Sequence, residues 1–336
     1  MKTQSQRLRG YALVVGAALL WASFGLFSRA LLARGLTSAT LVTFRAGLAA
    51  VAFVFWAWRA DAAHGTHAFK AAFRRWPFFA LYGLVGVVFF YNALVIAVDR
   101  GTVSMAVVLM YTAPAYVTLA AARLFGEPVT SRKRVALVLT FVGVVLVAGL
   151  HRGGLVGNPT TILAGLGAGV GYAYYSVAGR LAVDRHPLPV VLAHTFLFGS
   201  VISAVTWAPQ AARQWPLVAG SAAVAGVVLS MALVTVVIPY TLYLSAFKLI
   251  ETSRASITAS LEPVMATVLA ALILGEVPGA EALVGAGLVL AGVVLLQLPE
   301  KAGAIRAGGS HHPVEGTGGG LFSPAETNHP EGGARN

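Results

Sequence analysis

The chain contains no cysteine, and only 11% of its residues are charged. Without cysteine there can be no disulfide framework, no thiolate metal site and no cysteine nucleophile. So few charges, together with 57% apolar residues and a mean hydropathy of +0.78, exclude a soluble globular protein. The sequence also has no GxxxxGKS/T loop, which argues against ATP-driven work by this chain alone. These absences indicate a polytopic membrane protein without a cofactor or a metal.

Long apolar segments supply the membrane-spanning elements. Each is long enough to cross the roughly 30 Å hydrocarbon layer as a helix. They lie near residues 11–32, 39–58, 76–98, 102–124, 133–150, 160–182, 188–208, 217–247, 254–274 and 280–298. The first is expected to be a retained helix rather than a cleaved signal peptide. The sequence therefore predicts an all-α integral membrane protein with ten transmembrane helices.

The net charge of +12 comes from basic residues beside the ends of these segments. The positive-inside rule explains this distribution better than a nucleic-acid partner does. It predicts that both termini are cytoplasmic in an inner or plasma membrane. The expected partners are the lipid bilayer and a small-molecule substrate, and no nucleic acid.

The first half of the sequence recurs in the second half at an offset of 149 residues, from Tyr91/Tyr240 to Leu146/Leu295. Within this window Ser104 matches Ser253, Pro114 matches Pro263, and Gly126-Glu127 matches Gly275-Glu276. An internal duplication with an odd number of spans in each copy places the copies upside down relative to one another. Arg132 and Glu276 are then expected on opposite faces of the membrane.

The order and duplication of several short motifs point to one family. The motifs are WASFG at 21–25, Phe44-Arg45, Pro114 followed by Gly126-Glu127, and Leu261-Glu262-Pro263 followed by Gly275-Glu276. With them the chain resembles the EamA-type branch of the drug/metabolite transporter superfamily over residues 8–298. The resemblance implies a ten-helix carrier with a central cavity lined by the first four helices of each repeat, and with the fifth and tenth helices at the periphery. We expect repeats at 1–150 and 151–299 and a disordered cytoplasmic tail at 300–336.

Glu262 is the leading functional candidate, because a carboxylate near the middle of a span is costly unless it is paired or faces water. Helical rise puts it about 13 Å from the cytoplasmic end of its helix, and puts His194 and Arg45 about 10 Å from opposite ends of theirs. Either side chain is expected to approach Glu262 and form a charge pair or a proton-coupling cluster. The structural alternatives are that Glu262 only fixes helix packing, that Arg45 extends to the headgroups, and that His194 is an ordinary core histidine.

Aromatic and polar residues in the middle of the spans are the expected substrate contacts, because rings and hydroxyls together bind small polar or cationic molecules. They are Trp21, Tyr91, Asn92, Tyr111, Tyr172, Tyr175, Tyr243 and Ser260. Pro114 and Pro263 are the predicted hinges at symmetry-related points. Gly126 and Gly275 are expected to cap helix C-termini, and alternate glycines from Gly165 to Gly171 to allow close helix packing inside the bundle.

These features favour a secondary active transporter that works by alternating access and exports amino acids or related metabolites. The alternative within transport is multidrug or organic-cation efflux, and a passive channel lacks the expected rings of charge. The alternative from another class is a membrane-embedded enzyme, which the absence of an HExxH motif or paired aspartates disfavours. A monomer or weak homodimer is expected.

Overall fold

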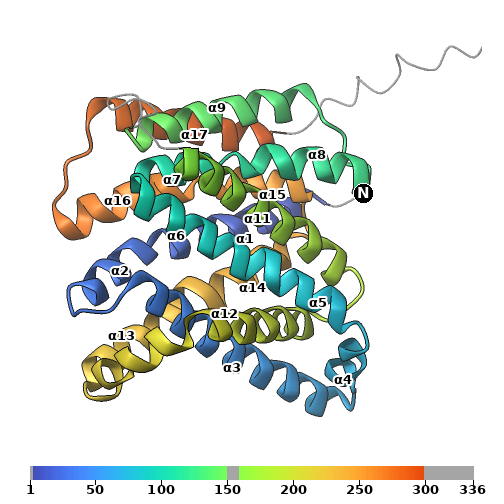
Figure 1. Cartoon of the computed structure of the whole chain (residues 1–336). Helices are drawn as coiled ribbons and strands as arrows, with labels where there is room; N and C mark the ends of the chain where they lie inside the picture. The colour runs from blue at the N-terminus through green and yellow to red at the C-terminus, as the bar shows by residue number, and fades with distance from the viewer. Residues whose placement is uncertain (1–2, 150–158, 299–336) are drawn as a thin grey trace, which may run out of the picture. The chain divides into compact units, whose positions relative to one another are not determined.

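The computed structural model describes residues 3–149 and 159–298. Within these ranges every regular element is a helix, and the helices pack side by side (Figure 1). The repeat boundary expected at 150 and the tail expected at 300–336 lie outside the described residues. The chain is thus all-helical in the part that positions the site.

The helices of the first half follow one another in the order that the second half repeats. The first half contains α1 (Gln4–Ala22), α2 (Phe24–Leu32), α3 (Ser38–His64), α4 (Ala68–Phe73), α5 (Trp76–Gly83), the π-helix η1 (Leu84–Phe89), α6 (Phe90–Arg100), α7 (Val103–Met110), α8 (Ala113–Phe125) and α9 (Ser131–Val147). The second half contains α11 (Pro159–Val183), α12 (Leu188–Ala219), α13 (Ala222–Ala232), the π-helix η2 (Leu233–Val237), α14 (Ile238–Ala246), α15 (Thr252–Ala259), α16 (Glu262–Leu274) and α17 (Ala280–Gln297). The π-helices and the paired short helices α7–α8 and α15–α16 recur at matching places.

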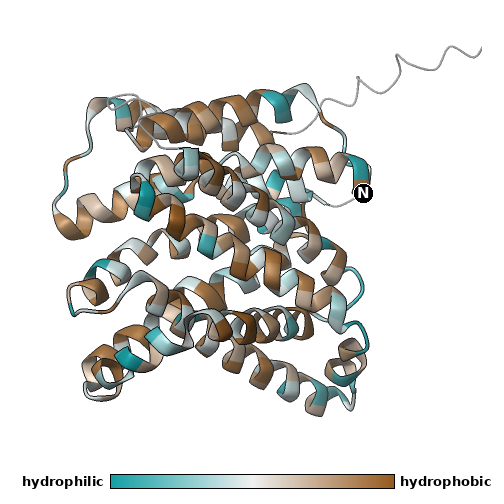
Figure 2. Cartoon of the chain, viewed as in Figure 1, coloured by the Kyte–Doolittle hydropathy of each residue, from teal (hydrophilic) through white to brown (hydrophobic). Residues whose placement is uncertain are grey.

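Eight stretches of the described chain are long and apolar enough to cross a membrane. They are Gln4–Leu32, Ser38–His64, Trp76–Arg100, Val103–Phe125, Leu188–Thr206, Ala222–Ala246, Thr252–Leu274 and Ala280–Gln297. The predicted spans at 133–150 and 160–182 correspond to α9, which has 17 residues, and α11, in which Gly and Tyr dilute the apolar residues. Figure 2 shows apolar residues along most helices and hydrophilic ones mainly near helix ends and loops. The chain is a multi-pass membrane protein, and the count of ten spans remains a prediction.

The seventh predicted span agrees with the structure, in which Leu188–Thr206 is long and apolar enough to cross a membrane. The helix itself is longer than the span, because α12 continues to Ala219 in spite of Pro209 and Pro216 within it. Its extension is held by Gln210 and Gln214, which hydrogen-bond to the turn between α2 and α3. A proline removes one helical hydrogen bond, and these tertiary contacts let the helix continue past that loss.

Three spans that look continuous in sequence are broken near their middle. The breaks lie at Ser23, at Tyr111-Thr112 and at Ser260-Leu261. Pro114 and Pro263 follow two of them and stand in the first turn of α8 and α16, where a missing N–H leaves no bond unmade. The predicted hinge positions are therefore helix restarts, and the flanking backbone can turn without breaking a regular helix.

Small residues allow equivalent helices to touch. A Cβ built on Gly143 of α9 would lie 2.6 Å from the carbonyl oxygen of Gly285 of α17, and one built on Gly292 would lie 3.1 Å from that of Ala136. These two contacts map onto each other in the repeat and run in opposite directions along the helices. α9 and α17, which lie together in Figure 1, therefore pack antiparallel about a local twofold axis.

The glycines of α11 also serve packing within the bundle, as expected. A Cβ on Gly165 would meet Leu109, one on Gly169 would meet Thr112, and one on Gly171 would meet Phe90. The C-terminal caps are confirmed as well, because Gly126 and Gly275 have φ angles of 65° and 69°.

Gly285→Ala is expected to lower the free energy of unfolding in detergent by about 1–3 kcal/mol, because its methyl group would overlap the backbone of α9. Gly287→Ala on the same helix is the matched control, since nothing lies within 4 Å of its added Cβ. It should be neutral or slightly stabilising, because alanine is the better helix former. Equal effects of the two substitutions would contradict the close packing of α9 and α17.

Candidate functional site

A carboxylate stands where two broken helices meet. Tyr111, at the end of α7, donates its hydroxyl to Oε2 of Glu262 at 2.8 Å, and Glu262 begins α16. The free N–H groups of a helix N-terminus stabilise a negative charge placed there. Glu262 is half-buried, so part of it remains open to a ligand or to water. The contact joins the two repeats at the points where Pro114 and Pro263 restart their helices.

Arg45 lies in the same region of the bundle as a buried cation. It is 4% exposed, and its guanidinium carbon lies 4.4 Å from the ring centre of Phe24 and 4.3 Å from that of Tyr91. The alternative that it extends to the headgroups is therefore wrong. Among the described residues it makes no hydrogen bond and no ion pair, and its Nε is buried without a partner. Two rings stabilise a cation only in part, so this guanidinium is suited to an anionic ligand.

No ion pair joins Arg45 and Glu262 among the described residues, although Tyr91 beside Arg45 and Tyr111 beside Glu262 belong to the same buried cluster. The two residues of the predicted charge pair therefore lie in one region of the bundle, but they do not form an ion pair with each other. Each is held by its own aromatic neighbours, Arg45 by Tyr91 and Glu262 by Tyr111. A molecule with both charges could bind between them.

Tyrosines and a tryptophan surround these groups. The hydroxyls of Tyr91 and Tyr240, which are repeat equivalents, meet at 2.6 Å and therefore lie on the local twofold axis. Trp21 packs edge-on against Tyr240 and Tyr243, at 5.3 Å in each case. The hydroxyl of Tyr243 in turn lies 3.0 Å from Ser176 Oγ. The aromatic residues expected to line a site thus do cluster at one place.

The remaining candidates are two tyrosines of this cluster and two polar residues. Tyr172 donates to Tyr243 at 3.5 Å, and Tyr175 packs against Tyr240 at 5.0 Å. Asn92 donates to the carbonyl oxygen of Val88 at 2.7 Å. Ser260 is buried at the end of α15, in the turn before Glu262.

His194 does not approach Glu262, contrary to expectation. Its ring lies 4.3 Å from Phe69 and 4.9 Å from Phe79, and its Nδ1 bonds to the carbonyl oxygen of Val190 at 2.9 Å. The reason is that this side chain faces α4 and α5, whose packing against α12 could not be read from helical rise alone.

Sequence reasoning missed two contacts of the site. Phe24, one of the rings on Arg45, belongs to the WASFG motif but was not singled out, because the helix break that turns it toward α3 was not expected. Ser176 was also missed, since a lone serine one turn after Tyr172 carries no signal of its own. The duplication does mark the Tyr91/Tyr240 contact, because both residues begin the matched window.

A cavity of about 520 Å³ approaches the site from one end of α16. Its lining includes Ala266 and Thr267, and Ala266 lies one helical turn after Glu262. Ser104 of α7 and Glu276, in the turn that leads into α17, also line it. The site therefore has a neighbouring space large enough for a small organic molecule.

The structure has two equivalent halves, and comparison with known protein families finds the same duplication. The model of the EamA-like transporter family matches residues 8–149 and again residues 159–298. The chain belongs to the EamA-like transporter family. A relative from Archaeoglobus fulgidus named "Uncharacterized transporter" is 26% identical over 211 residues, which cover 59% of this chain and 68% of the relative. Family and relative support a multi-pass membrane transporter, and they point away from an enzyme.

A solved crystal structure shares the fold of this EamA-like protein. It superposes with a TM-score of 0.71 over 87% of this chain and 96% of the other chain, at 21% identity. At that identity the likeness concerns the fold alone. The arrangement of helices is thus one that a protein chain is known to adopt.

Tyr111→Phe is expected to lower the free energy of unfolding by about 1–3 kcal/mol, because the Glu262 carboxylate loses its hydrogen-bond donor. Tyr116→Phe is the control, since this half-buried tyrosine of α8 makes no hydrogen bond among the described residues, and it should change stability by about 0.5 kcal/mol at most. Unfolding followed by tryptophan fluorescence in detergent measures both. A neutral Tyr111→Phe would show that the hydroxyl does not hold Glu262.

Proposed function

We propose that this EamA-like protein is a secondary active transporter that exports zwitterionic amino acids or closely related metabolites by alternating access. The observation that carries the proposal is the pair Arg45 and Glu262, which are opposite charges in one aromatic region without an ion pair between them. Arginine binds a carboxylate through two parallel hydrogen bonds. Glu262 would then hold the ammonium group, with tyrosine faces beside it.

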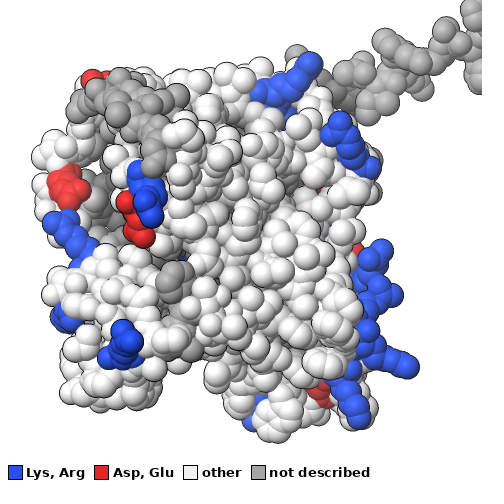
Figure 3. All heavy atoms as spheres, in the orientation of Figure 1, with Lys and Arg blue, Asp and Glu red and all other residues white. Residues whose placement is uncertain are grey.

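The proposed topology is ten membrane-spanning helices in two inverted five-helix repeats. Its support is the antiparallel packing of the equivalent helices α9 and α17. The equivalent pairs α7–α8 and α15–α16 also run in opposite directions, because Glu127, the second residue after α8, binds the first turn of α15. Figure 3 shows Lys and Arg side chains gathered along the edge near α4 and α5, which supports a cytoplasmic face there and cytoplasmic termini in an inner or plasma membrane.

Proton coupling is assigned to Glu262. Protonation of this carboxylate removes the charge that holds an ammonium group, so a proton that enters releases the substrate, and a departing proton restores the site. The exchange is then one proton in for one substrate molecule out at this group. His194 takes no part in it, because its ring is enclosed by phenylalanines.

A second candidate is efflux of hydrophobic cations. It is favoured by the aromatic cluster around Trp21 and Tyr240 together with a single carboxylate. The buried cation Arg45 weighs against it, since a second positive charge beside the guanidinium is repelled at low dielectric constant. Counterflow in proteoliposomes separates the two, with a labelled mixture of amino acids as one probe and tetraphenylphosphonium as the other.

Glu262→Gln is expected to abolish the pH dependence of amino-acid flux while the protein stays folded, because a glutamine amide does not titrate in the physiological pH range. Flux is measured in proteoliposomes with and without an imposed pH gradient. The folded state is checked by gel filtration and by thermal unfolding. Unchanged pH dependence would remove Glu262 from the coupling mechanism.

Arg45→Gln is expected to weaken transport of amino acids roughly tenfold or more, because the carboxylate loses a charged partner. The matched measurement is inhibition by the corresponding amino-acid methyl ester, which has no carboxylate and should lose little. Arg34→Gln is the control substitution, since this exposed arginine donates to the backbone carbonyl oxygen of Ala30. Equal losses for acid and ester would assign Arg45 to folding rather than to the substrate.

A further inference from the structure

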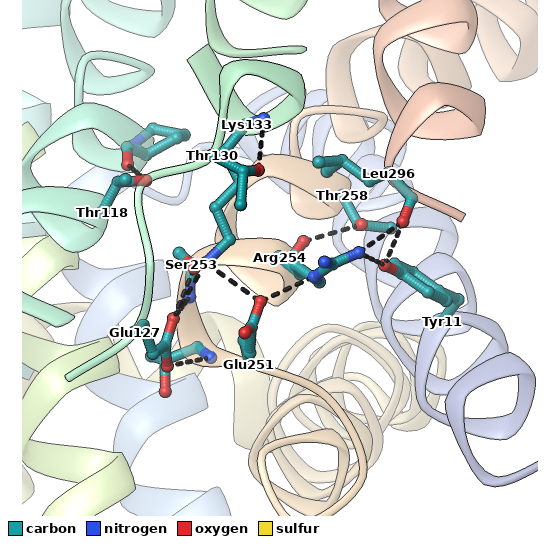
Figure 4. A network of polar contacts seen from close by, with 12 residues as sticks. Tyr11, Thr118, Glu127, Thr130, Lys133, Glu251, Ser253, Arg254, Thr258 and Leu296 are labelled. Carbon is teal, nitrogen blue, oxygen red and sulfur yellow. Dashed lines mark hydrogen bonds and ion pairs between the residues drawn. The ribbon is translucent and has the colours of Figure 1, made fainter. Parts of the chain in front are cut away.

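Glu127 closes one end of the bundle by binding the start of a helix from the other repeat. Its carboxylate accepts hydrogen bonds from the backbone N–H groups of Thr252 and Ser253, at 2.7 and 3.0 Å, and from the hydroxyl of Ser253 (Figure 4). These are the first N–H groups of α15, which have no partner inside their own helix. Glu127 follows the cap residue Gly126 directly, so the C-terminus of α8 is fixed to the N-terminus of α15.

Ion pairs reinforce this contact. Lys133 Nζ lies 2.9 Å from Glu251 and 3.8 Å from Glu127, and Glu251 also binds Arg254 at 2.6 Å. Burial raises the pKa of Glu251, but the Lys133 cation and the hydrogen bond from Arg254 outweigh it, and the pKa lies below its usual value. Arg254 donates further to the carbonyl oxygen of Leu296 at 2.6 Å. The group, here called the Glu127 cluster, consists of Glu127, Lys133, Glu251, Ser253 and Arg254 and ties α8, α9, α15 and α17 together.

The repeat duplicates only the central pair of this cluster. The offset of 149 residues matches Glu127 with Glu276 and Ser253 with Ser104. The same offset matches the reinforcing residues Lys133, Glu251 and Arg254 with Ala282, Thr102 and Met105. The opposite end of the bundle therefore keeps the carboxylate and the serine but has none of the supporting charges at the equivalent positions.

At that opposite end the equivalent contact is not made. Glu276 instead pairs with Arg29 at 3.0 Å, and the two side chains are 58% and 67% exposed. The cavity of about 520 Å³ lies between the first turn of α7 and the start of α17, and Val103, Ser104 and Glu276 all line it. The cavity thus occupies the place where the repeat would put a second helix-binding carboxylate.

We propose that Glu127 and Glu276 are alternating gate residues of the transport cycle. In the structure described here Glu127 holds its end shut and the Glu276 end is open. In the opposite state Glu276 binds the first turn of α7 through Ser104 and the N–H groups of 103 and 104, and Glu127 releases α15. The proposal rests on the alternating access of the proposed function, in which two inverted repeats exchange conformations.

The two gates differ in strength. An exposed ion pair such as Arg29–Glu276 contributes little to stability, so Glu276 leaves it easily. The Glu127 side chain is only 10% exposed and has charge-assisted hydrogen bonds, which are about twice as strong as neutral ones. Without substrate, the state closed at Glu127 is therefore the more populated one.

The experiment uses the natural absence of cysteine. Ala266→Cys places a single thiol in the lining of the cavity, and its rate of labelling by a bulky maleimide in nanodiscs reports how open that end is. Glu276→Gln in this background should shift the open-to-closed ratio toward open by roughly tenfold, and Glu127→Gln should shift it toward closed by a similar factor. Arg29→Gln is the matched control, because it breaks the exposed ion pair and leaves the gate carboxylate, so labelling should stay equal or fall.

A disulfide between Ser104→Cys and Glu276→Cys tests the closed contact directly, since a disulfide requires the two Cα atoms to come within about 7 Å. Its formation on oxidation should block labelling of a third cysteine at position 266 and stop amino-acid counterflow, and reduction should restore both. Labelling that is unchanged by both Glu→Gln variants, or changed in the same direction by both, overturns the gates. Amino-acid flux in that case leaves the transporter proposal standing, whereas opposite labelling shifts without any amino-acid flux support the gates and contradict the proposed substrate class.

Discussion

The hydroxyl of Tyr111 meets the carboxylate of Glu262 where two broken helices cross, and the arrangement of the site depends on this crossing. The crossing exists because each helix restarts at a proline, Pro114 or Pro263, so that two short helices replace one rigid span. A helix that restarts in mid-membrane leaves backbone N–H and C=O groups without hydrogen-bond partners. Lipid cannot supply these partners, whereas polar side chains that line a site can. The break would be unfavourable in contact with lipid. Here it places the Glu262 carboxylate at the N-terminus of α16, whose free N–H groups stabilise a negative charge.

Glycine residues allow the helices around this crossing to pack closely. The glycine face of α11 lies against Leu109 and Thr112, at the end of α7, and so brings Tyr172 to Tyr243 and toward Tyr111. The same principle acts outside the site, where Gly143 and Gly285 let α9 and α17 touch. Helices in a membrane associate through close packing rather than through the hydrophobic effect, so a methyl group at such a contact would move a whole helix. Close packing at glycine therefore helps to set the positions of the aromatic rings.

Much of the fold follows from sequence, because apolar length and the duplication are both properties of the chain alone. They predicted the order of the helices, the glycine caps and the packing face of α11. The break at Ser23 and the continuation of α12 to Ala219 could not be predicted, since both depend on contacts between helices that are distant in sequence.

The same limit applies to the site. The mid-span position of Glu262 marked it as a candidate, but only the structure shows that Tyr111 contacts it and that His194 faces phenylalanines instead. Glu127 and Glu276 had a visible signal, the repeated Gly-Glu pair, which the capping role of the glycine was enough to explain without the acid.

A bundle built from two identical repeats would have two conformations of equal free energy. Here the charged residues differ between the repeats, so the two conformations differ in free energy. Glu262 stands opposite Ala113 in the repeat, Arg45 opposite His194, and Lys133 opposite Ala282. The apolar and glycine contacts that shape the helices are shared between the halves, whereas none of these three charged residues is repeated at its equivalent position. Symmetry of packing lets the bundle rearrange without losing its core, because each contact that opens has an equivalent that closes. Asymmetry of charge then decides which state is favoured and which one a ligand must stabilise, since a ligand shifts a population only through its different affinity for the two states.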